Sequence, residues 1–530
     1  MLPAMPDSVV HLNRRQIHRA ALLWALAGWS VRSAQARLLA VPRWRTDPFA
    51  LGVASGQPRS DGFVLWTRLM VDDASTTEGQ PAAAGEGGVP VQWTVFEGEG
   101  GRLRPVRSGE VIAWSSHGYS VHVRLEGLRP GRAYHYRFDC GGASSAMGRT
   151  RTAPAPDASV DRLRLALASC QHYEQGFFAA HRDIAQHELD AVLFVGDYIY
   201  EGSSASYTAR RHGSPTPHSL DDYRARHALY KRDPDLQAAH AAHPWIVTLD
   251  DHEVVNDYAA DRDPAYTDPA RFLRRRAAAY RAYFEHMPLA VAPVGSNWRL
   301  HDRFEWGRLA ELSTLDTRQY RSHHACADPA RDVGRSVIGC AELADPGRTL
   351  LGAEQARWLA TGLAASRRRW NLVAQATQMS ATGIDSSQGR SIWTDGWDGY
   401  PLERRRLLQA ASDAGVRNLV TLGGDVHRHV AADLRIQPNE LRSPVVASEF
   451  VGCSVTSRGA SQAAMARMQR DNPDIRHARG DERGWALLHI GPQRLRCDLR
   501  STPHPVAPDA TLSVQASFVI EAGRAGVLTG

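Results

Sequence analysis

The stretch that organises this chain reads L-R-L-A-L-A-S-C-Q-H at residues 163–172 and A-V-L-F-V-G-D-Y-I-Y-E at residues 191–201. Each half is a short apolar run that ends abruptly in polar residues, which is typical of a buried parallel strand. In open α/β sheets the ligand binds beyond the carboxyl ends of the strands. Cys170 and Asp197 both follow such ends, so the sequence predicts that they meet at one edge of a sheet.

Two further strands end in the same kind of chemistry. H-P-W-I-V-T-L at 243–249 leads into D-D-H-E, and N-L-V-T-L at 418–422 leads into G-G-D-V-H. One such Asp has an ordinary explanation, because Asp often caps the helix that follows a strand. Four strands that end in Cys, Asp, His or Tyr favour another explanation, since a buried charge is costly unless it is paired or binds a metal. We therefore interpret the four strand ends as parts of one metal site.

The composition is that of a soluble globular protein with an ample core. The chain has 530 residues, a net charge of +6, 43% hydrophobic residues and 23% charged residues, which allows roughly two to four domains. The basic residues are mostly Arg spread along the chain. Because no dense basic block with interleaved aromatic residues occurs, we expect no stable nucleic-acid binding, and the modest basicity suits an anionic substrate.

Residues 1–36 are expected to form an export signal. The pair Arg14–Arg15 precedes an apolar segment at 20–29, and A-Q-A at 34–36 is a small-x-small cleavage site. Paired arginines in this place resemble a twin-arginine signal, which implies the twin-arginine export machinery as a partner and a periplasmic or secreted protein. An ordinary secretory signal and an amphipathic helix are the alternatives. The apolar segment is too short to span a bilayer, and the sequence predicts no transmembrane segment elsewhere.

The remaining sequence divides into two parts. Residues 46–154 alternate apolar and polar side chains between turn signals, which predicts a small β-sandwich of the fibronectin or immunoglobulin kind. A linker, T-A-P-A-P-D, follows at 152–157. From 160 to 510 strands alternate with helical segments, so the fold class expected for this part is α/β.

The chain has six cysteines, and Cys170 is set aside as a ligand. Cys326 and Cys340 flank a short polar loop and are the best candidates for a disulfide in an oxidising compartment. The pairing of Cys140, Cys453 and Cys497 stays open, because buried free thiols explain them equally well.

Seven short motifs occur in a fixed order along the chain. They are D-P-F-A-L-G-V-A-S-G-Q-P (47–58), S-C-Q (169–171), G-D-Y-I-Y-E (196–201), D-D-H-E-V-V-N (250–256), L-D-T-R-Q-Y-R (315–321), W-D-G-Y-P (397–401) and G-G-D-V-H (423–427). Over about residues 46–500 the set resembles the PhoD-type alkaline phosphatases and phosphodiesterases. The resemblance implies a metallophosphoesterase-like αββα sandwich after the small β-sandwich. It also implies a secreted, metal-dependent hydrolase of phosphate mono- or diesters.

Residue chemistry and the resemblance together suggest the metal ligands. Asp197 is placed to bridge two cations, and Cys170 and Tyr200 are expected to bind one of them. A thiolate with a phenolate favours an oxidised transition metal, and the resemblance implies Fe³⁺. Asp251 and Asp425 offer only oxygen, which suits Ca²⁺ or a similar hard cation better than zinc.

The sequence leaves the roles of several further residues open. His427 is either a ligand or a residue just behind the ligands, and Asn256 and Gln375 are further possible ligands. His252 is expected to protonate the leaving group or to contact phosphate oxygens, and its alternative is a helix-capping role. Glu253 could hold His252 in place.

Arg318 also has two interpretations. It is either a bidentate phosphate clamp or an ordinary Asp–Arg pair that holds a loop.

Charge explains how such a site would work. Two cations would neutralise the phosphoryl oxygens and lower the pKa of a bridging water, so that hydroxide attacks in line. The chain has no S-x-x-K or G-x-S-x-G motif, so no serine nucleophile is indicated. The natural substrate, the preference for mono- or diesters, the number of divalent cations and the oligomeric state remain open.

Two other functions are less consistent with the sequence. A cell-envelope binding protein with a vestigial metal site would usually have lost at least one ligand, whereas the expected set is intact. A sulfatase would carry C-x-P-x-R, but Gln171 and His172 follow Cys170. The hydrolase remains the favoured interpretation.

The first prediction concerns export. The double substitution Arg14→Lys with Arg15→Lys should leave the precursor in the cytoplasm, because the export receptor reads the arginine pair as an address. Cell fractionation with immunoblotting measures this, and Arg32→Lys, beyond the apolar segment, is the matched control. Normal accumulation of the double variant outside the cytoplasm would contradict the twin-arginine interpretation.

Overall fold

The computed structural model describes residues 43–71, 87–98, 102–205 and 208–530. The expected export signal at 1–36 therefore lies outside the described residues. Within those ranges, no helix has the length and apolar character needed to cross a membrane.

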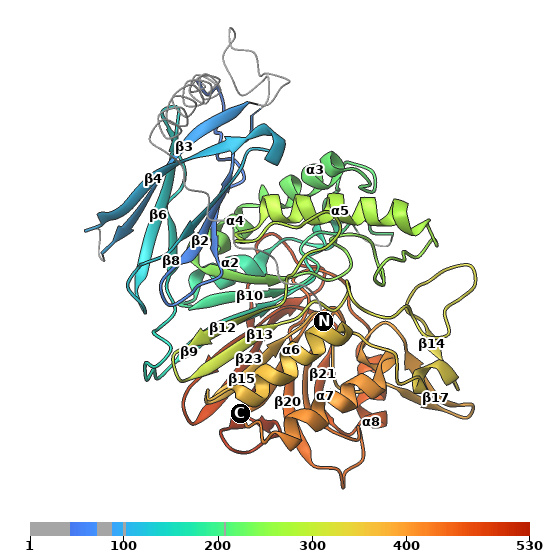
Figure 1. Cartoon of the computed structure of the whole chain (residues 1–530). Coiled ribbons are helices and arrows are strands. Elements are labelled where there is room, and N and C mark those ends of the chain that lie inside the picture. The colour runs from blue at the N-terminus through green and yellow to red at the C-terminus, as the bar shows by residue number, and fades with distance from the viewer. Residues whose placement is uncertain (1–42, 72–86, 99–101, 206–207) are drawn as a thin grey trace, which may run out of the picture.

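Two large sheets form the centre of the molecule (Figure 1). The first has ten strands, and its middle consists of three parallel strands, β9 (Leu163–Ala168), β10 (Ala191–Val195) and β11 (Pro244–Thr248). Beyond β9 it continues through the antiparallel strands β22 (Glu482–Ile490), β23 (Arg494–Pro503), β24 (Ser513–Glu521) and β25 (Leu528–Thr529). The second sheet has seven strands, in the order β12 (Asp302–Trp306), β13 (Ala310–Thr314), β15 (Trp370–Ala374), β18 (Leu419–Gly423), β20 (Val445–Val451), β19 (His429–Arg435) and β21 (Ile475–Arg479).

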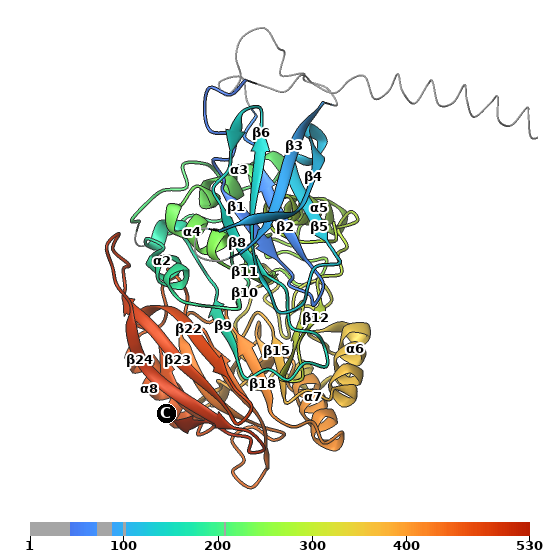
Figure 2. The ribbon, with the colours of Figure 1, turned by 90° about the vertical axis from the view of Figure 1, so that its left-hand side faces the viewer.

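The side chains of β10 show why the apolar run at 191–195 contains no polar residue. Leu193 and Val195 point to the core between the two sheets, whereas Val192 and Phe194 point to helices on the outer face. The outer helices of the first sheet are α2 (Ala179–Gln186), α3 (Leu220–Lys231), α4 (Pro234–Ala242) and α5 (Pro269–His286). The second sheet is covered by α6 (Gly352–Ala365) and α7 (Pro401–Asp413), and α8 (Gln462–Asp471) packs beside β21 (Figure 2). The expected α/β class is thus confirmed, with two sheets packed between layers of helices.

The N-terminal part differs from the expected separate domain. β1 (Val53–Gly56), β2 (Phe63–Arg68) and β5 (Ser120–Leu125) continue the ten-stranded sheet, and β1 pairs in parallel with β11. A second sheet packs on them, built from β3 (Gly88–Glu97), β4 (Arg104–Trp114), β6 (Ala133–Cys140), β7 (Ala143–Ser144) and β8 (Gly148–Arg151). The segment 46–154 therefore forms two packed layers, but one of them belongs to the central sheet. β1 pairs with Pro244 and Trp245, so it covers the first part of the β11 edge, which would otherwise expose its backbone groups.

Smaller elements complete the chain. A three-stranded sheet contains β14 (Ser336–Val337), β16 (Ile384–Ser386) and β17 (Gly389–Trp393). Single helical turns lie at Ser115–His117, Tyr173–Gln175, Ala341–Ala344 and Trp397–Gly399. The predicted disulfide between Cys326 and Cys340 is present, and the other four cysteines are free and buried.

Gly196 makes the sharp turn at the end of β10 that directs Asp197 toward the second sheet. Its φ is +96°, in the region that L-residues avoid, and a Cβ there would lie 2.5 Å from the Cβ of Asp250. Only glycine satisfies both constraints at this position.

The second prediction tests that turn. Gly196→Ala should lower the free energy of unfolding by about 2–4 kcal/mol, because it combines left-handed strain with overpacking against Asp250. Denaturant unfolding measures the change. Gly202→Ala is the control, since no atom lies within 4 Å of its added Cβ. Equal stability of the two variants would show that the turn tolerates a side chain.

Candidate metal centre

The strand ends meet where the carboxyl edges of the two sheets face each other. Cys170 follows β9, Asp197 follows β10 and Asp251 follows β11, while His427 follows β18. Cys170, Asp197 and His427 each offer a ligand atom, and these atoms lie within 4.8 Å of one another. Asp197, Asp251 and His252 form a second such group. Asp197 belongs to both groups, which is the geometry that a bridging carboxylate requires.

The backbone at these residues is strained. Cys170, Asp197, Asp425 and His427 all have φ between +51° and +63°. Left-handed backbone is uncommon for residues other than glycine and persists only where the surrounding structure enforces it. Strain at four residues after three strand ends, β9, β10 and β18, indicates that side-chain placement there overrides local backbone preference.

Asp197 and Tyr200 form the middle of the site. The Tyr200 hydroxyl donates to Oδ2 of Asp197 at 2.7 Å and accepts from Ser457 Oγ at 2.8 Å. The other carboxylate oxygen, Oδ1 of Asp197, is buried and has no hydrogen-bond partner among the described residues. A buried carboxylate oxygen without a donor is costly, so this atom marks a place for a cation.

His427 is oriented as a ligand would be. Its Nδ1 lies 2.9 Å from the carbonyl oxygen of Arg458, which can only accept, so Nδ1 carries the proton. Nε2 is left with its lone pair directed into the site, 3.1 Å from the Tyr200 hydroxyl. Burial lowers the pKa of His427 to about 3, so the ring is neutral. Of the two roles open for His427, the geometry favours the ligand.

The donor atoms fit a pair of unlike cations. Thiol, phenol and imidazole gather around Asp197, a set that suits a transition metal, whereas the neighbouring carboxylates suit a harder ion. Burial, and then the charge of Asp197, raise the pKa of Cys170 and of Tyr200 well above the usual values. A bound cation would reverse this effect and stabilise thiolate and phenolate.

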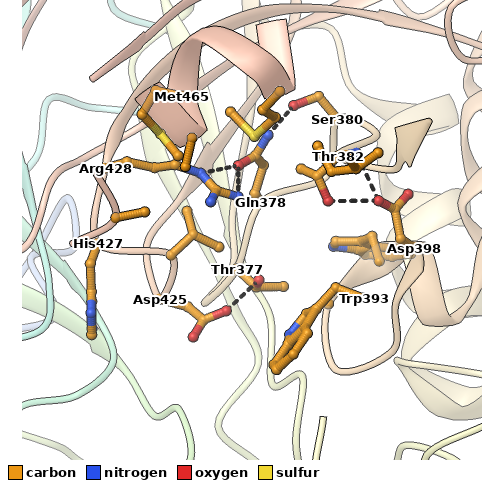
Figure 3. A pocket seen from close by; sticks show the side chains of 17 residues that line it. Thr377, Gln378, Ser380, Thr382, Trp393, Asp398, Asp425, His427, Arg428 and Met465 are labelled. Carbon is orange, nitrogen blue, oxygen red and sulfur yellow. Dashed lines mark hydrogen bonds between the residues drawn. The ribbon is translucent and has the colours of Figure 1, made fainter. Parts of the chain in front are cut away.

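Asp425 lies at the margin of this centre. It belongs to neither of the two groups above, and its Oδ2 accepts from Thr377 Oγ1 at 2.6 Å. Burial, followed by the nearby Asp395, raises its pKa to about 6. The carboxylate lines a cavity beside His427 (Figure 3). Its role as a ligand therefore remains a prediction.

His252 is held by Glu201, not by Glu253. Nδ1 of His252 lies 2.7 Å from Oε2 of Glu201, and the ring centroids of His252 and Tyr200 lie 4.1 Å apart with their planes tilted by 33°. Burial opposes a charge on His252, but Glu201, Asp251 and Asp197 outweigh it and raise the pKa of His252 well above its usual value. The expectation for Glu253 was wrong, because its carboxylate accepts from the backbone amides of Tyr198 and Asp250 instead.

Arg318 is the cation of a buried carboxylate cluster. Its Nε lies 2.5 Å from Asp250, and its two Nη atoms bind both oxygens of Asp395 at 2.8 and 3.0 Å. Asp251 lies 3.7 Å away, and the Arg318 side chain is 1% exposed. The geometry therefore supports the ion-pair interpretation of Arg318 and not a phosphate clamp.

Asp395 and Asp250 are site residues that sequence reasoning did not assign. Asp395 also accepts from Arg321 and lies 2.8 Å from His324 Nε2, and Oδ2 of Asp250 is buried without a partner among the described residues. Asp250 could have been found from the doubled Asp after β11. Asp395 follows no apolar strand of the kind that singled out the other acids, so that pattern could not find it.

Gln375 and Asn256 are the two remaining possible ligands, and the structure excludes only the first. The side-chain oxygen of Gln375 accepts from the Thr377 amide at 3.0 Å and from Trp397 Nε1 at 3.1 Å. Gln375 is thus committed to holding a loop, and the expectation that it ligates a metal was wrong. The backbone amide of Asn256 donates to Glu201, and its possible role as a ligand stays a prediction.

Comparisons with known proteins agree on one family. A model of the PhoD-like phosphatases matches residues 165–499, and a model of their N-terminal domain matches residues 33–154. Alkaline phosphatase D of Bacillus subtilis (strain 168) is 40% identical over 501 residues, which cover 92% of this chain and 83% of that protein. A solved structure of PhoD superimposes with a TM-score of 0.86 at 39% identity, covering 92% of this chain and 93% of the other.

The third prediction concerns Arg318. Arg318→Ala should lower the free energy of unfolding by about 3–5 kcal/mol, because it leaves the buried Asp250 without its cation and removes the bidentate partner of Asp395. Thermal and denaturant unfolding measure this. Arg335→Ala is the control, since its pair with Asp328 is exposed and should contribute less than about 1 kcal/mol. A stable Arg318→Ala variant with only a raised KM would restore the clamp interpretation.

Proposed function

We propose, since this chain belongs to the PhoD-like phosphatase family, that it cleaves phosphate mono- and diesters with the help of two unlike cations held between its sheets. That it is a phosphoric ester hydrolase follows from the family and from its identity with alkaline phosphatase D. The observation that carries the proposal is Asp197, which belongs to both ligand groups and keeps one buried carboxylate oxygen free of hydrogen bonds within the described structure.

The donor types support an assignment of each cation. Cys170, Tyr200 and His427, with Asp197, would hold Fe³⁺, because thiolate, phenolate and imidazole suit a transition metal. Asp197, Asp251 and Asp425 would hold Ca²⁺, because they offer only oxygen. When bound, the two cations supply positive charge that neutralises phosphoryl oxygens and makes hydroxide available near neutral pH.

His252 is the proposed proton donor. Glu201 accepts from Nδ1, so Nε2 is the nitrogen left to reach a substrate. Glu201, which is assigned to neither cation, is the first of the carboxylates that raise the pKa of His252, and a raised pKa favours the protonated imidazole that proton donation to a departing alkoxide requires. Arg318 touches no position open to substrate, and its role is to fix the orientation of Asp250 and Asp251.

The disulfide supports an exported protein. Cys326–Cys340 closes a loop that begins just after His324, whose Nε2 lies 2.8 Å from Asp395. Disulfides persist in oxidising compartments, which agrees with the proposed periplasmic or secreted location. The alternative of a binding protein with a vestigial site is less well supported, because the two ligand groups are assembled and retain an unpaired carboxylate oxygen.

The fourth prediction tests the cation assignment. Protein isolated with its metals should be coloured, because phenolate bound to Fe³⁺ absorbs visible light, and Tyr200→Phe should remove most of the colour. Tyr198→Phe is the matched control, since that hydroxyl pairs with His240 at 2.7 Å in the helical layer. Absorption spectra with elemental analysis measure both.

Asp197→Asn should lower kcat/KM by more than about a hundred-fold.

Chelation of Ca²⁺ alone should stop hydrolysis of p-nitrophenyl phosphate reversibly while the colour persists, since the two sites differ in donor type. A colourless, iron-free and fully active protein would overturn the roles given to Cys170 and Tyr200.

A further inference from the structure

A cavity of about 420 Å³ adjoins the candidate metal centre on the side of Asp425 and His427. Its walls come from α8, from the end of β17 and from the loop after β15. The volume lies within the range of small-molecule sites. The cavity is larger than a single phosphoryl group needs, so it has room for an organic group attached to the phosphate.

One wall of this cavity is apolar. Met465 and Met468 are each 3% exposed and pack against the core beneath β19 and β21. Trp393 lies at the opposite wall and is 47% exposed. A thioether floor and an open indole face favour contact with an aryl or alkyl group.

The cavity also contains a guanidinium without a direct acidic partner. Nε and Nη2 of Arg428 both donate to the amide oxygen of Gln378, at 3.0 and 2.8 Å. Across the described ranges of the chain, no carboxylate forms an ion pair with Arg428, and Asp425, Asp398 and Glu449 act on it only at longer range. The carboxylate of Asp398, which also lines the cavity, is already paired with Arg404. An arginine side chain stays protonated in proteins.

Arg428 and the metal centre lie on different sides of the cavity. Figure 3 shows the polar ends of Asp425 and His427 pointing to one side, while Arg428 and Gln378 lie on the other. A phosphoryl group bound at the metal centre would therefore leave Arg428 for another part of the substrate. An unpaired guanidinium in a half-buried place binds an anion well, because the anion relieves its desolvation.

We propose that this cavity binds the second ester substituent of a phosphodiester, and that Arg428 selects substituents that carry a negative charge of their own. The apolar wall of Met465 and Trp393 contacts the carbon skeleton of that substituent. This inference rests on the proposed function, because it requires a phosphodiester at the metal centre. It makes Arg428 a specificity residue for the established hydrolase reaction.

Four p-nitrophenyl phosphodiesters test the proposal. They share the p-nitrophenolate leaving group and differ only in the second substituent, which is methyl, phenyl, 4-carboxyphenyl or 4-phosphonophenyl. For the wild-type protein, kcat/KM should rise about ten-fold from methyl to phenyl through apolar contact. It should rise by about ten-fold again for at least one anionic aryl ester through the charged hydrogen bond to Arg428. Which anionic ester is preferred distinguishes carboxylate from phosphate recognition.

Variants separate the two contributions. Arg428→Gln should remove the preference for the anionic esters and keep the preference of phenyl over methyl, and Arg428→Lys should retain part of the former. Ala464→Trp, which fills the cavity, should lower the phenyl-to-methyl ratio by about ten-fold. Ala466→Trp is the matched control, because Ala466 lies on the same helix, is exposed and does not line the cavity.

The outcomes are distinguishable. A wild-type protein that hydrolyses the methyl ester but shows no preference among the four esters overturns this inference and leaves the proposed function intact. An Arg428→Gln variant that keeps the wild-type preference for anionic esters, with unchanged thermal unfolding and metal content, also overturns this inference and leaves the proposed function intact. Failure of the metal-loaded wild-type protein to hydrolyse any of the four esters or p-nitrophenyl phosphate contradicts the proposed function itself.

Discussion

The pairing of Arg318 with Asp250 and Asp395 is the interaction on which the centre of the molecule depends. Several carboxylates lie buried at the strand ends, and each loses the hydration that would stabilise its charge. Arg318 supplies the one fully buried guanidinium that contacts Asp250, Asp251 and Asp395 together. A buried pair of this kind contributes little net stability while it is complete, but it becomes very costly when one partner is lost.

Asp197 has no arginine partner of this kind among the described residues. Burial raises its pKa well above the usual value; the charge of His252 opposes this effect, whereas the carboxylates of Asp251 and Asp250 reinforce it. Asp251 contacts Arg318 and also belongs to a ligand group with Asp197, so it connects the arginine-paired acids to the candidate metal centre. Metal ions bound there as proposed would add their binding energy to the stability of the fold.

Much of this centre could be predicted, because the parallel strands are apolar on both faces and their polar ends stand out in the sequence. Cys170, Asp197 and Asp251 were found in this way. The partner of His252 was not, because Glu253 is adjacent in sequence while Glu201 is adjacent in space. The choice between a phosphate clamp and an ion pair for Arg318 could not be made from the sequence, because its bidentate partner Asp395 lies 77 residues further along the chain. α3 and α4 are separate helices, because Asp233 caps the second one and Pro234 begins it, which is a break signal readable in the sequence.

The placement of β1, β2 and β5 in the central sheet has a consequence for how the polypeptide can be divided. β1 and its partner β11 are far apart in the sequence, because most of the N-terminal region and two crossover connections lie between them. Ser55 of β1 pairs with Pro244 of β11. Contacts between such distant segments form late during synthesis and slow folding. Removing the N-terminal region would therefore take away the strand that pairs with Pro244 and Trp245 of β11. Exchange or deletion of that region would change the ten-stranded sheet that positions Cys170, Asp197 and Asp251.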